Sequence, residues 1–314
     1  MSTIKDFRRD TPPMTAQAEN AARARLLAAA REPERRHAPR LGRRLGWRLA
    51  VAGALAVTVG TGVVVATDRP RAVVPVASVQ ELGERAAQAA YDDRGQVPNS
   101  GQWLYIRELQ APQSKDGSYG VDVSQRVVWE QWTSVDGKQT AGLSPNGKPL
   151  VQGNHPGLGA ADLAQQPVTP DGVLAKIRQK LEDMHMVSAT GPLPSMDERL
   201  FQAVYQLMGT QALPPEVRAA LFRGLATLPG VSFTEDVADA DGRRGVAFSH
   251  TRKWNRYDLI LDPVDFHFLG TYGVTVKDRT TDYTDAPNHV VKAGTPLTLT
   301  AQLETKVVDG PGQR

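Results

Sequence analysis

The chain has 314 residues, of which 40% are hydrophobic and 23% charged, a composition typical of a globular protein that excludes wholesale disorder. It contains no cysteine, which excludes a disulfide framework, a thiol nucleophile and a cysteine-ligated zinc site. Residues 1–48 hold 12 basic and 5 acidic residues (net +7), whereas the remainder holds 25 basic and 29 acidic residues (net −4). The basic isoelectric point therefore comes from the first 48 residues, and we expect no nucleic-acid partner for the rest.

Residues 1–48 are predicted to form a basic cytoplasmic segment with one short helix. Pro12 and Pro13 interrupt any earlier helix, and the pattern that follows indicates a helix from an N-cap at Thr15 to about Glu32. One short helix buries little surface by itself. Two interpretations remain open: a positive topology signal with a tether, or a segment that docks on a cytoplasmic protein partner or on the anionic inner leaflet.

Residues 49–67 contain no charged side chain and would span about 28 Å as a helix, close to the thickness of the hydrocarbon layer. Arginines crowd the N-terminal side of this run. We therefore expect a transmembrane helix in the lipid bilayer of a bacterial plasma membrane, with the N-terminus cytoplasmic and the C-terminal domain extracytoplasmic. The alternatives are a buried core helix and a signal peptide cleaved after Ala66.

Small residues recur at every fourth position in this run, at Ala52, Ala56 and Gly60. This spacing lets two helices approach closely, which predicts a homodimer through these residues. The alternative is that small residues are simply common in membrane helices.

An extracytoplasmic domain is predicted over residues 78–308, after an extended linker at residues 68–77. Ser78 followed by Glu81 matches a capping box and predicts a helix at the start of this domain. Two strand patterns follow, in residues 102–110 and 121–134, and the second leads into the hairpin signal Asp136-Gly137.

The middle of the chain is predicted to be a loop followed by helices. Residues 141–170 are rich in Gly, Pro and Asn, which indicates a long surface loop. Apolar residues then recur with helical spacing in three segments, of which the second begins with the capping box Ser195–Glu198. These segments are residues 170–184, 195–209 and 214–230.

The last third of the chain predicts an antiparallel meander. A polar hairpin tip at residues 238–242 separates two strand patterns, and residues 297–307 alternate strictly between apolar and polar side chains. Residues 309–314 are expected to be a disordered tail. The fold class predicted from these patterns is α+β: one transmembrane helix plus an extracytoplasmic curved antiparallel sheet packed on helices.

Residues 7–32, FRRDTPPMTAQAENAARARLLAAARE, precede an arginine cluster and an uncharged run, and the later segments QWLYIRELQ and YDLILDPVDFHFLGTYGVTV complete a pattern over most of the chain. This pattern resembles an uncharacterised family of bacterial single-span membrane proteins, often encoded beside extracytoplasmic-function sigma factors. The resemblance implies a regulatory or sensory role. The zinc-binding anti-sigma module has a His and Cys pair, whereas this chain has no Cys and only His37 in its first 48 residues.

The late hairpin YDLILDPVDFHFLGTYGV is similar to the half-barrel of periplasmic lipoprotein carriers, whose concave face holds an acyl chain. The resemblance implies that aromatic side chains of the strands would line a ligand-binding face. The alternative is that these aromatics are ordinary core residues. The candidate ligand-binding residues are Trp103, Tyr105, Trp129, Phe266 and Phe268.

No catalytic motif is present in the sequence. Residues 153–159, GNHPGLG, lack the lysine of a phosphate-binding loop, and Pro145 breaks the nucleophile-elbow pattern in residues 142–147. We therefore expect no enzyme activity, catalytic residue, cofactor or metal site. Two functions remain: a regulatory or sensory protein with an extracytoplasmic domain and a link to a sigma factor, or a tethered domain that binds or carries an apolar ligand such as a lipid.

Overall fold

The computed structural model describes residues 75–93, 98–114, 119–154, 157–184, 193–280 and 290–314. Nine strands form one sheet in the order β4-β3-β2-β1-β11-β8-β7-β6-β5, and every pairing between neighbours is antiparallel. The strands of this sheet are β1 (Trp103–Gln110), β2 (Val127–Ser134), β3 (Gln139–Leu143), β4 (Pro149–Gly153), β5 (Val231–Ala238), β6 (Arg244–Thr251), β7 (Asn255–Leu261), β8 (Phe268–Thr275) and β11 (Pro296–Val308). A separate two-stranded ribbon pairs β9 (Arg279–Thr280) with β10 (Val290–Val291).

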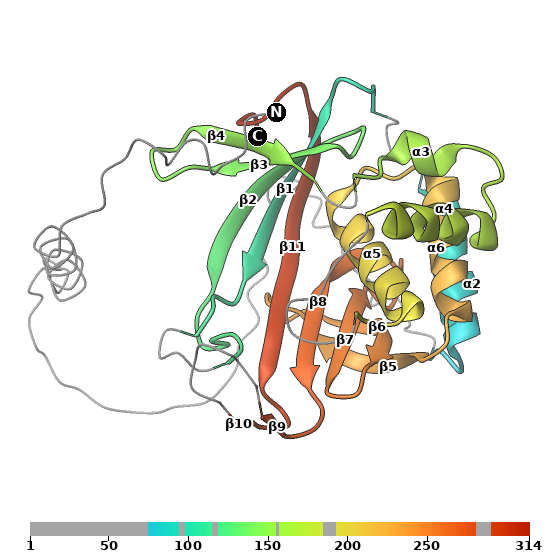
Figure 1. Ribbon diagram of the computed structural model, residues 1–314, viewed down its shortest axis with the longest axis vertical. Helices are drawn as coiled ribbons and strands as arrows, with labels where there is room; N and C mark the ends of the chain where they lie inside the picture. Colours follow the sequence, from blue (N-terminus) through green and yellow to red (C-terminus); the bar gives the residue numbers. More distant parts are fainter. Residues whose placement is uncertain (1–74, 94–97, 115–118, 155–156, 185–192, 281–289) are drawn as a thin grey trace, which may run out of the picture. The chain divides into compact units, whose positions relative to one another are not determined.

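The described helices gather against the part of the sheet that contains β11 and β5 to β8, whereas β2, β3 and β4 extend away from them (Figure 1). We call the sheet face toward the helices the inner face and the opposite face the outer face. The helices are α2 (Val79–Asp92), α3 (Ala160–Ala164), α4 (Pro170–Asp183), α5 (Met196–Thr210) and α6 (Pro215–Thr227).

The predicted capping residues begin two of these helices. The Ser78 hydroxyl accepts a hydrogen bond from the Glu81 backbone N–H at the start of α2. At the start of α5, Ser195 and Glu198 satisfy each other's backbone N–H groups, which confirms the predicted capping box. These bonds provide partners for N–H groups that no intrahelical carbonyl reaches.

The main core lies between the helices and the inner face. The rings of Phe222 on α6 and Phe248 on β6 stack with centroids 6.1 Å apart, and Phe201 on α5 stacks on His250 at 5.2 Å. The side chains of Phe201 and Phe248 are fully buried. Burying a side chain of this size contributes roughly 1.5–3 kcal/mol, so this interface is the main source of cohesion between the two layers.

Strand β11 joins the two halves of the sheet, with β1 on one side and β8 on the other. The strand predicted from the strict alternation in residues 297–307 is confirmed, because these residues belong to the 13-residue strand β11. A bulge shifts the β1–β11 register between Arg107 and Glu108. Because of this shift, Gln302 and Thr305 both lie on the inner face, although they are three residues apart.

The outer face has its own sealed cluster around Trp132, which is fully buried although the described helices lie on the other face. Its ring lies 5.4 Å from that of Tyr105, and its Nε1 donates to the Gln313 carbonyl at 2.7 Å. Arg314 forms an ion pair with Glu130 on β2. Residues 309–314, expected as a disordered tail, thus contact the outer face.

The predicted hairpin at residues 238–242 is confirmed between β5 and β6. The buried Asp239 carboxylate accepts from the backbone N–H groups of Asp241 and Arg243 and pairs with the Arg243 side chain. Arg243 also donates to the carbonyl of Leu269. Asp239 therefore organises the turn, in agreement with a polar hairpin tip.

The predicted fold class, an α+β fold with one transmembrane helix plus a curved antiparallel sheet packed on helices, is wrong. The structure is mostly one large nine-stranded antiparallel sheet with few helices. The longest described helix, α5, has 15 residues and rises about 22 Å, less than the roughly 30 Å of hydrocarbon that a spanning helix crosses. None of the helices in the described ranges combines the length and the apolar character that a membrane crossing requires.

The sheet is larger than predicted because residues 141–170 are not one long loop. They contain the end of β3, all of β4 and the short helix α3. Every residue of β4 is exposed, so this strand has no buried face and shows no alternation of apolar and polar residues. A strand that is exposed on both faces does not need the alternation of apolar and polar residues by which strands are recognised in a sequence.

Several predictions fall on residues outside the described ranges. These are the cytoplasmic segment 1–48, the uncharged run 49–67, most of the linker 68–77, and the homodimer contact through Ala52, Ala56 and Gly60.

Candidate ligand-binding cavity

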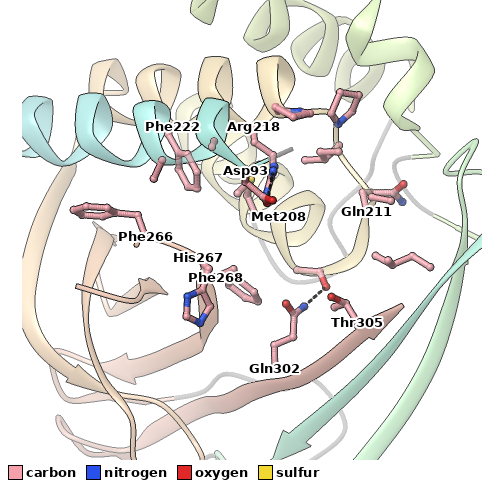
Figure 2. Close-up of a pocket in the computed structure, with 18 of the residues that line it drawn as sticks. Asp93, Met208, Gln211, Arg218, Phe222, Phe266, His267, Phe268, Gln302 and Thr305 are labelled. Carbon is pink, nitrogen blue, oxygen red and sulfur yellow. Dashed lines mark hydrogen bonds and ion pairs between the residues drawn. The ribbon is translucent and has the colours of Figure 1, made fainter. Parts of the chain in front are cut away.

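A cavity of about 860 Å³ lies between the inner face and the helices. Its wall comes from the C-terminal end of α2, the connection from α5 to α6, the turn between β7 and β8, and strands β1 and β11 (Figure 2). This volume is within the range of about 300–1,000 Å³ that is usual for small-molecule sites.

Aromatic rings form one side of the cavity. Phe222 comes from α6, and Phe266 and Phe268 come from the turn between β7 and β8 and from the start of β8. Met208, near the end of α5, adds a flexible apolar side chain to the lining. Figure 2 shows the three rings on the same side of the opening.

The backbone of Phe266 is strained. Its φ of 58° lies in the left-handed region, which bulky residues rarely adopt. The turn fixes this conformation, because the Phe266 N–H donates to the Asp262 carbonyl at 3.1 Å and the Asp262 N–H donates to the His267 carbonyl at 2.9 Å. Strain of this kind costs of order 1–3 kcal/mol and tends to occur at binding sites. Here it accompanies a ring that lines the cavity.

Uncharged polar groups form another side of the cavity. Gln302 on β11 donates from Nε2 to the Gly209 carbonyl at 3.2 Å, which joins the sheet to the end of α5 (Figure 2). Thr305 lies three residues further along β11, at the exposed edge of the cavity. Gln211, only 7% exposed, lines the cavity from the α5–α6 connection, and its Oε1 atom has no hydrogen-bond partner among the described residues.

The charged groups of the lining have partners within the protein. Arg218 on α6 pairs with Asp93 at 2.7 Å. His267 pairs with Asp265. Lys306 borders the cavity through its backbone, because its side chain lies on the outer face, where it pairs with Glu304 at 2.5 Å. The Oδ1 atom of Asp92 accepts a hydrogen bond from Gln88 at 3.2 Å. Each of these side chains therefore has a hydrogen-bond or ion-pair partner within the protein before any ligand is considered.

The five candidate residues do not come together in one place. Phe266 and Phe268 line the cavity. Tyr105 lies on the outer face against Trp132, and Trp103 packs at the edge of the same cluster. Trp129, at the exposed start of β2, is 47% exposed. The structure therefore separates the candidates into two cavity residues and three residues elsewhere.

Within the described ranges, His250 and His267 do not form a metal site with each other. His250 pairs in register with Tyr257, whereas His267 lies beyond Leu261, whose partner on β6 is Val246. Four residues of strand correspond to about 13 Å, so these two histidines are far apart along the sheet.

One group in the described residues has spacing that suits a metal ion: Asp262, Asp265 and His267, whose ligand atoms lie within 4.8 Å of one another. The Oδ1 atom of Asp262 already accepts from the backbone N–H groups of Val264 and Asp265. This use of the carboxylate is accounted for by the turn between β7 and β8, so the grouping gives no sign of a metal.

Sequence reasoning missed the cavity residues that come from helices and from their connection, namely Met208, Gln211 and Phe222. Met208 and Phe222 lie in the apolar stripes of predicted helices, where a cavity residue looks the same as a core residue. Gln211 follows the end of α5 and belongs to no pattern. The sequence contains no signal that would have singled out these three residues.

Comparisons with protein families, with curated proteins and with solved structures found no match to this chain. The assignment of a function depends on the cavity itself.

Proposed function

We propose that the described domain binds an apolar ligand such as a lipid in the cavity between the inner face and the helices. The observation that carries this proposal is a cavity of about 860 Å³ with three phenylalanine rings in its wall. Concave spaces of this size that combine aromatic side chains with a few polar groups are typical of small-molecule binding sites.

The strained backbone of Phe266 supports the same proposal. A glycine at this position would adopt the φ of 58° without strain, whereas the chain places a large aromatic residue there. The ring contributes to the cavity wall and its residue is 9% exposed. Strain at a cavity residue is consistent with a geometry that serves a ligand.

The regulatory or sensory function, with a link to a sigma factor, stays a prediction. It depends on residues 1–48, which lie outside the described ranges. The predicted location in a plasma membrane depends on residues 49–67 and stays a prediction for the same reason.

The test is a binding titration of the purified full chain with N-phenyl-1-naphthylamine, an uncharged probe whose fluorescence rises in apolar surroundings. We expect saturable binding with one site per chain. The variant Ala212→Phe adds a ring to the cavity lining and should lower the affinity by about tenfold or more, since it occupies space the probe needs.

The matched control is Ala293→Phe, which adds the same ring at an exposed position outside the cavity lining. This variant should bind the probe as the wild type does. Circular dichroism spectra establish that both variants are folded. A wild-type protein that shows no saturable binding, or an Ala212→Phe variant that binds as tightly as the wild type, would refute the proposal.

A further inference from the structure

The lining of the cavity is divided by chemistry. Figure 2 shows Phe222, Phe266 and Phe268 toward one side, and Gln211, Gln302 and Thr305 toward the other. These polar residues carry amide or hydroxyl groups, which hydrogen-bond without carrying a charge. A purely hydrocarbon ligand would leave such groups against an apolar surface, which is unfavourable.

The charges of the lining do not favour an anionic ligand. The lining contains three carboxylates, Asp92, Asp93 and Asp265, against one permanent cation that can face the cavity, Arg218. Lys306 pairs in register with Tyr105, so its charged group lies on the outer face beside Glu304. The Nη2 group of Arg218 already pairs with Asp93. An anionic headgroup would have to displace Asp93 or stay without a counter-charge, and either outcome costs free energy.

A buried amide supplies an independent observation. The Oε1 atom of Gln211 is buried and has no partner among the described residues, although the residue lines the cavity. A buried acceptor without a donor costs about 1–3 kcal/mol. A ligand hydroxyl or amide N–H that reached this region would recover part of that cost.

We infer that the ligand is an amphipathic molecule with an uncharged hydrogen-bonding headgroup, such as a monoacylglycerol or another neutral acylated polyol. Its apolar chain lies against the three phenylalanine rings, and its hydroxyl groups lie toward Gln211, Gln302 and Thr305. This inference rests on the proposed function and specifies the class of ligand.

The experiment measures displacement of N-phenyl-1-naphthylamine from the full chain by 1-monolauroylglycerol and by laurate at neutral to mildly basic pH, both below their aggregation concentrations. The two competitors share the same acyl chain and differ in the charge of the headgroup. We expect the glycerol ester to compete with an apparent Kd about tenfold or more below that of laurate, because only the anion must be desolvated without a free counter-charge.

A variant locates the headgroup. Thr305→Val keeps the shape of the side chain and removes its hydroxyl, so it should weaken the glycerol ester severalfold and leave laurate unchanged. Thr251→Val makes the same change at an exposed residue at the end of β6, outside the cavity, and should change neither.

The outcomes separate the two proposals. If laurate competes as well as the glycerol ester, or better, the inference about the headgroup is wrong and the apolar site remains. An equal effect of Thr305→Val on both competitors also contradicts it. If the wild type binds neither the probe nor either competitor, both proposals fail.

Discussion

The two faces of the sheet use aromatic side chains in opposite ways. On the outer face, Trp132 and Tyr105 are fully buried, and residues 309–314 lie against this cluster without any described helix above it. On the inner face, Phe266 and Phe268 lie under helices, yet they border a cavity of about 860 Å³. The aromatic side chains of the outer face are therefore the more completely buried, although only a short segment covers them. The presence of aromatic residues on a strand does not reveal whether they belong to the hydrophobic core or to a binding site.

The difference comes from what lies next to the rings. Trp132 has protein atoms around it and a hydrogen-bond acceptor for its only polar atom, at 2.7 Å. The rings of the inner face have protein on one side and the cavity on the other, so part of their surface lacks packing partners. We expect the outer cluster to support stability and the inner rings to support binding.

The largest effect should follow from Trp132→Ala. Removing a fully buried tryptophan and its hydrogen bond should lower the free energy of unfolding by about 3–5 kcal/mol. Urea denaturation of the full chain at fixed pH measures this loss. The comparator Phe268→Ala should lose roughly 1–2 kcal/mol, because the ring already borders empty space. Equal losses of unfolding free energy in the two variants would contradict the proposed difference between the outer cluster and the rings that border the cavity.

Trp129→Ala serves as the control for loss of a tryptophan from the same strand. Trp129 is 47% exposed, so its removal should change stability by no more than about 0.5 kcal/mol. A larger loss would mean that Trp129 contacts something beyond the described residues.

Much of the sheet could be predicted from the sequence, because hairpin residues and alternation are local signals. The turn at Asp136-Gly137, the hairpin tip with Asp239 and the alternating strand β11 all follow from such signals. Strand β4 could not be predicted, because an edge strand exposed on both faces needs no apolar alternation. The predicted fold class was wrong because the prediction underestimated the extent of the sheet and included a membrane-spanning helix in the fold.

The site was predictable only where the chain turns. Phe266 lies in a recognisable turn and Phe268 directly follows it, and both line the cavity. In β1, Trp103 and Tyr105 alternate with Leu104 and Ile106, so both faces of the strand carry apolar side chains. Alternation alone cannot decide which set faces the helices, since a shift of one residue exchanges the faces. The structure places Leu104 in the cavity wall and Tyr105 on the outer face.

An intermediate effect should follow from Asp258→Asn, which tests how much a buried carboxylate on the outer face lowers the free energy of unfolding. Asp258 is fully buried on β7; its Oδ2 atom lies 3.0 Å from Arg256, and its Oδ1 atom has no partner among the described residues. Burial raises the pKa of this carboxyl group. Replacing it with the neutral amide should raise the free energy of unfolding at neutral pH by about 1 kcal/mol, since Arg256 is partly exposed and can be hydrated.

The pH dependence gives the sign of this effect. A carboxyl group whose folded pKa is raised binds its proton more tightly in the native state than in the unfolded state, where the pKa is about 3.8. The stability it contributes is complete below pH 3.8 and is lost as the pH rises through the folded pKa. The advantage of Asp258→Asn should therefore grow with pH in urea denaturation. A variant less stable than the wild type at neutral pH would show that the pair with Arg256 is a net stabilising contact.

The smallest effect should follow from Arg314→Ala, which releases the end of the tail from the outer face. Hydrogen bonds from Arg314, and then from the Tyr105 hydroxyl, lower the pKa of Glu130 to about 2. Without Arg314 the pKa of Glu130 should rise toward 4.5, and a carbon-13 titration of the carboxyl group would measure this change. The control Lys306→Ala breaks the exposed pair with Glu304 and should leave the pKa of Glu130 unchanged.

The pH dependence of stability provides a second test of Arg314→Ala. A depressed folded pKa contributes stability that is present above pH 4.5 and is lost as the pH falls through about 2. The difference in Tm between the wild type and Arg314→Ala should therefore be constant near neutral pH and disappear in that acidic window. A difference that persisted below pH 2 would mean that Arg314 stabilises the fold through contacts other than its pair with ionised Glu130.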